Sequence, residues 1–133
     1  MAYQFDYDST NRILRCRVDG HVTDEVLKEF YRVAAASFAQ MDPYRAIIDL
    51  SGVTSSELSP QAVSEVAGSA PPASDVRRLR VIFAPSGAIF ELACMFQFEG
   101  DSTRPNWHVV RTLKEAWAVL GVQEPQFKRL HET

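Results

Sequence analysis

The sequence predicts a single α/β domain with a mixed, mostly parallel sheet of five strands and about four helices, in the order β-β-α-β-α-β-α-β-α. Two observations lead to this fold class. Apolar and polar side chains alternate through residues 3–8 and 14–18, which is the period-two pattern of half-buried strands. After them, short apolar runs alternate with segments of helical periodicity, as in a parallel sheet whose strands are joined by right-handed helical crossovers.

The two alternating runs form a predicted opening hairpin. Polar residues 9–11 between them favour a tight turn, and Gly20 closes the second strand. Thr23 is then the expected N-cap of an amphipathic helix whose first turn is acidic and whose apolar stripe continues to Met41. The run 46–50 is short and apolar without alternation, which predicts a central strand covered on both faces.

The second half repeats the strand-and-helix pattern. Residues 51–59 are polar and predict a loop, after which Ser59 and Pro60 fit the cap and first position of a second helix. The segment 68–72 is rich in glycine and proline and ends that helix. A fourth strand at 79–84 then leads to a third helix capped by Ser86.

The last strand and helix close the predicted domain. A polar loop covers 99–106, a strand covers 107–110, and a capping box at 112–115 starts a helix that stops at Gly121. The domain therefore spans 1–121. Residues 122–133 form a C-terminal tail with one short helical turn around Phe127 and Leu130.

Composition excludes several classes of protein. The net charge is −3 with acids and bases interspersed, which argues against nucleic-acid binding, and the short basic cluster at 77–80 is expected to be solvated. No apolar run reaches the roughly 18 residues of a membrane span, and the N-terminus lacks the pattern of a signal peptide, so a cytoplasmic protein is expected. Two isolated cysteines and three scattered histidines predict no disulfide, metal or cofactor.

Three stretches, taken in order, resemble the SpoIIAA-like branch of the STAS and SEC14 families, which include the bacterial anti-sigma-factor antagonists. Residues 47–54 are similar to the central strand of the family and the loop after it. Residues 80–96 are similar to the fourth strand and third helix, and residues 109–117 to the closing strand and helix. The resemblance implies a SpoIIAA-like fold and a bacterial regulatory protein that binds another protein or a second copy of itself as a homodimer.

The phosphate-acceptor motif of that family is degenerate here. Phosphorylatable members carry Asp-Ser-Ser-Gly where this sequence has residues 57–60, Glu-Leu-Ser-Pro. Leu58 stands at the acceptor position and has no hydroxyl, so a switch based on phosphorylation there is not expected. Ser59 keeps a hydroxyl near a helix N-terminus, where a phosphate is electrostatically favoured, and its alternative role is a helix cap.

Two groups of residues are candidate binding sites. The polar loop is the candidate surface for a protein partner, with Asp49, Ser51, Gly52, Thr54, Glu57 and Ser59. The helix after Ser86 is apolar almost all round, which predicts either a core helix or one with an open apolar face. Its region supplies the candidates for a nonpolar ligand or an interface, namely Phe83, Ser86, Phe90, Cys94, Met95, Phe98 and Trp107.

Three hypotheses of function follow. The first is a non-enzymatic, STAS-like regulatory module that engages a protein partner. The second is a carrier or sensor of a small nonpolar ligand, which the SEC14 side of the resemblance implies because those relatives carry lipids. The third is a small hydrolase that uses Ser51 or Ser86 with His108 and Asp49, but no sequence spacing supports this group, and no catalytic residue is assigned.

Overall fold

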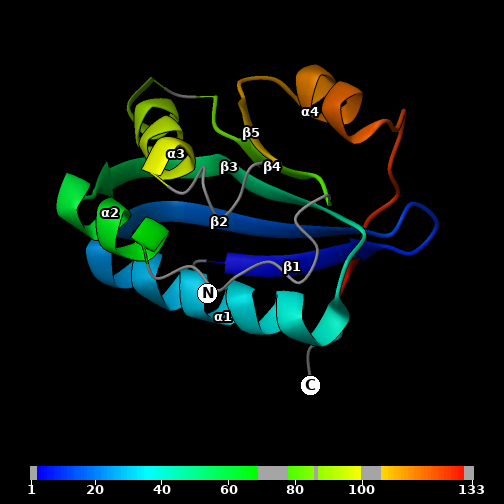
Figure 1. Cartoon of the computed structure of the whole chain (residues 1–133), viewed down its shortest axis with the longest axis horizontal. Coiled ribbons are helices and arrows are strands. Elements are labelled where there is room, and N and C mark those ends of the chain that lie inside the picture. Colours follow the sequence, from blue (N-terminus) through cyan, green and yellow to red (C-terminus); the bar gives the residue numbers. More distant parts are fainter. Residues whose placement is uncertain (1–2, 69–77, 86, 100–105, 131–133) are drawn as a thin grey trace.

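The computed structural model describes residues 3–68, 78–85, 87–99 and 106–130 (Figure 1). Its elements, in chain order, are β1 (Tyr3–Asp8), β2 (Ile13–Thr23), α1 (Asp24–Met41), β3 (Arg45–Glu57), α2 (Pro60–Gly68), β4 (Arg80–Phe83), α3 (Gly87–Glu99), β5 (Trp107–Val110), α4 (Leu113–Leu120) and β6 (Lys128–Arg129). The predicted α/β class and element order are confirmed, and one further strand follows the last helix.

The sheet has six strands in the order β5-β4-β3-β2-β1-β6. Strands β2 to β5 are parallel to one another, while β1 is antiparallel to β2 and β6 is antiparallel to β1. The predicted helical turn around Phe127 and Leu130 is wrong, because this part of the tail pairs with β1 and the Leu130 N–H donates to the Phe5 carbonyl at 2.9 Å. An edge strand carries unpaired backbone groups, and the tail satisfies some of them.

The helices divide unequally between the two faces of the sheet. Figure 1 shows α4 apart from the other three helices. The larger core cluster joins the sheet to α1 and α3, and includes Leu14, Cys16, Ile48, Ile82, Phe30, Ala34, Ile89 and Ala93. The smaller cluster joins the opposite face to α4, and includes Ile13, Ile47, Val81, Ala116 and Leu120. The central strands are therefore buried on both faces, as the run 46–50 predicted.

Strands β2 and β3 are longer than predicted. Gly20 does not end β2, which continues to Thr23, and most of the predicted loop 51–59 belongs to β3. Two register shifts occur in this pair, and Gly20 has a φ of +82°, which lets the strand bend without stopping. The polar side chains of residues 51–57 reflect exposure. They do not prevent a strand, because the ladder is made by backbone groups.

The predicted helix caps are confirmed wherever the structure describes them. Thr23 Oγ1 accepts from the Val26 N–H at 3.3 Å, and Ser59 Oγ accepts from the Ala62 N–H at 3.1 Å. Thr112 Oγ1 accepts from the Glu115 N–H at 3.1 Å, and Gly121 ends α4 with a φ of +72°. Ser86, most of the segment 68–72 and residues 100–105 lie outside the described residues. Within the described ranges, no helix combines the length and the hydropathy that a membrane span requires.

Asp8 connects the opening hairpin to the C-terminal tail. The residue is only 1% exposed. Its carboxylate accepts from the backbone N–H groups of Asn11 at 3.0 Å and of Gln126 at 2.8 Å. Burial by itself would raise the pKa of Asp8, but the hydrogen bonds from Asn11 and Gln126 outweigh it and hold the pKa below its ordinary value of 3.8.

We expect Asp8→Ala to lower the free energy of unfolding by about 1–3 kcal/mol at neutral pH, because two partly buried N–H groups lose their acceptor. The lowered folded-state pKa fixes the sign of the pH dependence. The contribution is fully present above the unfolded-state value near 3.8 and is lost as the pH falls through the lower folded-state pKa. Urea unfolding of the wild type and of Asp8→Ala over a pH series measures this contribution to the free energy of unfolding. A difference between them that stays constant down to about pH 2 would contradict this account.

Candidate functional site

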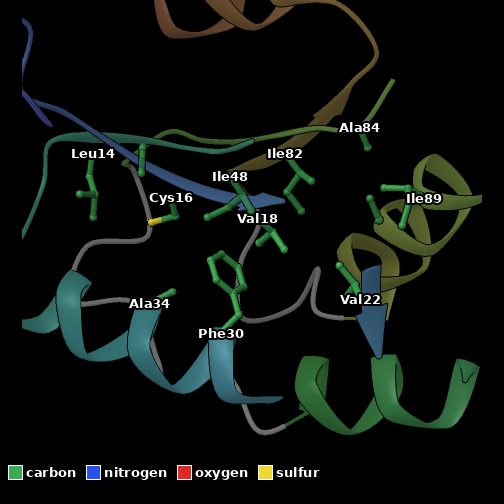
Figure 2. Close-up of a cluster of buried hydrophobic side chains, with 12 residues drawn as sticks. Leu14, Cys16, Val18, Val22, Phe30, Ala34, Ile48, Ile82, Ala84 and Ile89 are labelled. Carbon is green, nitrogen blue, oxygen red and sulfur yellow. The ribbon is translucent and has the colours of Figure 1, made fainter. Parts of the chain in front are cut away.

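A cavity of about 310 Å³ lies between the sheet and the helices α1, α2 and α3. Phe30 and Ala34 of α1 line it, and Figure 2 shows both side chains facing Val18 and Ile48 of the sheet. Ala93 of α3 lines the opposite side. Sites for small molecules in proteins begin at about 300 Å³, and a cavity of about 150 Å³ already binds benzene. The space is therefore large enough for a small nonpolar molecule.

Small side chains leave this space open. Ala34 and Ala35 of α1 line the cavity, whereas Ala36 on the same helix is exposed. Ala93 lies across from them on α3. Protein interiors are normally packed as densely as organic crystals, so a row of alanines facing a gap leaves space that larger side chains would occupy.

One end of the cavity is charged. Among the described residues that line it, the charged ones are Asp42, Arg78 and Arg80. Arg78 pairs with the carboxylate of Asp42, the residue that caps the C-terminal end of α1. The Arg80 guanidinium donates to the Pro43 carbonyl at 3.2 Å and lies 5.0 Å from the centre of the Phe38 ring. Arg80 was expected to be solvated, but it is only 8% exposed because these partners replace water.

Trp107 is the aromatic candidate that the structure places in the cavity wall. Its ring stacks on Phe38 with centroids 6.4 Å apart and meets Phe96 edge-on at 5.8 Å. All three rings line the cavity. They come from β5, α1 and α3, so the aromatic wall is assembled from three separate parts of the chain.

The other candidates of the aromatic region lie elsewhere. Phe83 is buried on the opposite face of the sheet with α4, and Phe98 is 81% exposed. The Arg111 guanidinium lies 4.7 Å from the centre of the Phe90 ring. Cys94 and Met95 are half-buried, and none of these five residues is among those that line the cavity within the described ranges. Ser86 lies outside the described residues. The cavity face of α3 carries Ile89, Leu92, Ala93 and Phe96.

Three of the loop candidates have structural roles. Asp49 is 5% exposed, and its carboxylate accepts from the Ser51 N–H at 2.9 Å and the Ser51 hydroxyl at 2.6 Å. A Cβ on Gly52 would lie 1.8 Å from Asp19 Oδ1, so the missing side chain makes room for the carboxylate that pairs with Arg17. The structure therefore uses Asp49, Ser51 and Gly52 to shape the surface around β3.

Ser59 joins the start of α2 to the start of α1. Besides capping its own helix, its hydroxyl donates to Asp24 Oδ2 at 2.8 Å. The hydrogen bond from the Ser59 backbone N–H lowers the pKa of Asp24. The remaining loop candidates, Thr54 and Glu57, are exposed on β3.

Residues that the sequence analysis did not combine form a hydrogen-bonded chain beside Glu57. The Nδ1 atom of His21 lies 2.6 Å from Ser55 Oγ, and its Nε2 atom lies 2.9 Å from Glu57 Oε1. The parallel pairing of β2 with β3, with its register shifts, places His21 opposite Ser55. No signal along the sequence indicates this pairing, because the two residues are 34 positions apart.

Serine, imidazole and carboxylate are also the groups of nucleophilic catalysis. Here, however, all three residues are exposed, and none is among the described residues that line the cavity. Among the described residues of the hydrolase hypothesis, which exclude Ser86, no such chain is assembled. Ser51 is bonded to Asp49 on β3, whereas His108 is exposed on β5, and β4 lies between these strands.

One comparison with solved structures shows the fold. The chain is similar to the structure of the anti-sigma factor antagonist SpoIIAA in its unphosphorylated form, with a TM-score of 0.54 and 17% sequence identity. The match covers 88% of this chain and 96% of that chain. Neither a protein-family model nor a curated protein sequence matches the chain. The SpoIIAA-like fold that the sequence resemblance implied is therefore confirmed.

Proposed function

We propose that this chain of SpoIIAA-like fold is a non-enzymatic binding module that carries or senses a small nonpolar ligand. The cavity of about 310 Å³ between the sheet and helices α1, α2 and α3 is the observation that carries this proposal. Its wall is built mainly from aliphatic and aromatic side chains, and the charged groups among its described lining residues lie at one end. Such a space favours a nonpolar molecule, because water inside it would find few hydrogen-bond partners.

A pair of matched substitutions on α1 tests the ligand site. We expect Ala34→Leu to weaken the binding of decanol, used as a nonpolar probe, by at least about tenfold. The added leucine atoms occupy the space of several probe methylenes, each worth about 0.8 kcal/mol when buried. Ala36→Leu, on the exposed side of the same helix, should bind decanol as the wild type does. Isothermal titration calorimetry measures all three affinities, and equal binding by the two variants would refute the site.

Regulation through a protein partner is the second candidate function. It is supported by the exposed polar cluster of His21, Ser55 and Glu57 at the ends of β2 and β3, by the exposed Thr54 next to it in β3, and by the similarity to a structure named as an anti-sigma factor antagonist. Leu58 connects the two candidates. It occupies the position where the family resemblance implies the acceptor serine, and its side chain lines the cavity. A ligand could then act on the surface where other members are phosphorylated.

Substitutions that change the size and charge of exposed side chains on that surface test the second function. We expect a double variant, Thr54→Arg with Glu57→Lys, to lose a protein that co-purifies with the wild-type chain, because both exposed side chains change in size and charge. Lys114→Glu on the exposed side of α4 is the matched control and should keep that protein. Light scattering shows whether the partner is a second copy of the chain. Identical partners for all three proteins would argue against this surface.

A further inference from the structure

The charged end of the cavity indicates the chemical class of the ligand. This inference rests on the proposed function, the binding of a small nonpolar ligand in the cavity. Val26 and Asp42 lie near opposite ends of α1, and both line the cavity. Sixteen residues of helix at about 1.5 Å each separate them, which is roughly 24 Å. Near Val26 the lining is apolar, with Val22, Leu58 and Val63. The cavity is therefore elongated along α1, apolar at one end and charged at the other.

Within the described part of the chain, the charged end carries more positive than negative charge. Among the described lining residues it holds two guanidinium groups, Arg78 and Arg80, and one carboxylate, Asp42. Arg80 is 8% exposed, so its charge acts in surroundings where water screens it weakly. The ion pair between Arg78 and Asp42 shows that this end already accommodates a carboxylate. Guanidinium groups bind carboxylates strongly, because their planar N–H groups match the two carboxylate oxygens.

The volume limits the apolar part of the ligand. A cavity of about 150 Å³ holds benzene, with six carbon atoms, so 310 Å³ suits a chain of about twelve. Two long acyl chains would not fit in that space. A single extended chain also matches the elongated shape better than a broad ring system does.

We propose that the ligand is a single-chain carboxylate of medium length. Its head group lies at the end formed by Asp42, Arg78 and Arg80, and its chain runs along α1 toward Val26. Binding is non-covalent, and no bond is made or broken. The head group supplies orientation, while burial of the chain supplies most of the affinity.

Paired probes that differ only in the head group test this inference on the full chain. We expect decanoate to bind the wild-type protein about tenfold more tightly than decanol, as measured by calorimetry below the concentration at which decanoate forms micelles. Arg78→Gln should reduce the affinity for decanoate by about tenfold and leave that for decanol unchanged. Asp42→Asn should raise the affinity for decanoate, because a competing negative charge is removed. Arg17→Gln, on the opposite face of the sheet, is the control and should change neither affinity.

The outcomes separate this inference from the function on which it rests. Equal affinities of the wild type for decanoate and decanol would overturn the carboxylate head and leave the nonpolar site intact. Tighter binding of decyl phosphate than of decanoate would overturn it in favour of a phosphate head. If neither decanoate nor decanol binds, the proposed ligand function fails as well. Should Arg78→Gln not fold, the predicted gain in Asp42→Asn still decides the question.

Discussion

Replacing Phe30 by alanine is expected to lower the free energy of unfolding by about 3–5 kcal/mol. Phe30 is 6% exposed in the larger core cluster. Its ring lies parallel to the Phe5 ring with centroids 6.3 Å apart, and its centroid lies 5.9 Å from that of the Tyr3 ring. Phe30 also lines the cavity, so its removal enlarges an existing space. The cost of such a deletion rises with the volume of the cavity that remains.

Phe98→Ala provides the matched control, since it removes the same ring from a position that is 81% exposed. We expect it to change stability by no more than about 0.5 kcal/mol. Urea unfolding monitored by circular dichroism compares the two variants with the wild type. Similar losses of unfolding free energy in Phe30→Ala and Phe98→Ala would mean that α1 is not packed on the sheet through Phe30.

Leu120→Ala is expected to cost about 2–5 kcal/mol of unfolding free energy. Leu120 ends α4 and is 2% exposed. It belongs to the smaller cluster with Ile13, Ile47 and Val81, which lies on the face of the sheet opposite the cavity. Because α4 is the helix in this cluster, truncation of Leu120 removes much of what attaches the helix to the sheet.

A leucine at the other end of the same helix serves as the control for this prediction. Leu113 is 42% exposed, and we expect Leu113→Ala to cost less than about 1 kcal/mol. Chemical denaturation again measures the difference. Decanol binding gives a second readout, because Leu120 is not among the described residues that line the cavity and the folded Leu120→Ala protein should bind the probe normally. If the folded Leu120→Ala protein did not bind decanol, the two faces of the sheet would be coupled.

The two faces of the sheet thus differ in how closely the helices pack on them. The face under α4 is closed by ordinary packing, including Trp117 against the Phe127 ring with centroids 6.2 Å apart. The face under α1 and α3 borders the cavity, which is partly open. Stability predictions apply to both faces, whereas the ligand predictions concern one of them.

Local signals determined the order of the elements and the ends of the helices. Thr23, Ser59 and Thr112 cap helices as expected, because a cap is a hydrogen bond to a backbone group three residues along the chain. Gly121 ends α4 for a similarly local reason, since it adopts a positive φ. A short apolar run without alternation located the buried strand at 46–50 in the same way, from neighbouring residues alone.

Only the tertiary structure decided how far β3 extends, where the tail lies and what lines the cavity. Strand β3 continues through polar residues because β2 lies beside it, and residues 128–129 form a strand because β1 offers an edge. The cavity depends on the space left between Ala34, Ala93 and the sheet, and its charged end joins Asp42 to Arg78, which is 36 positions away along the chain. These features are set by distances between remote segments, and a one-dimensional pattern of side chains does not contain those distances.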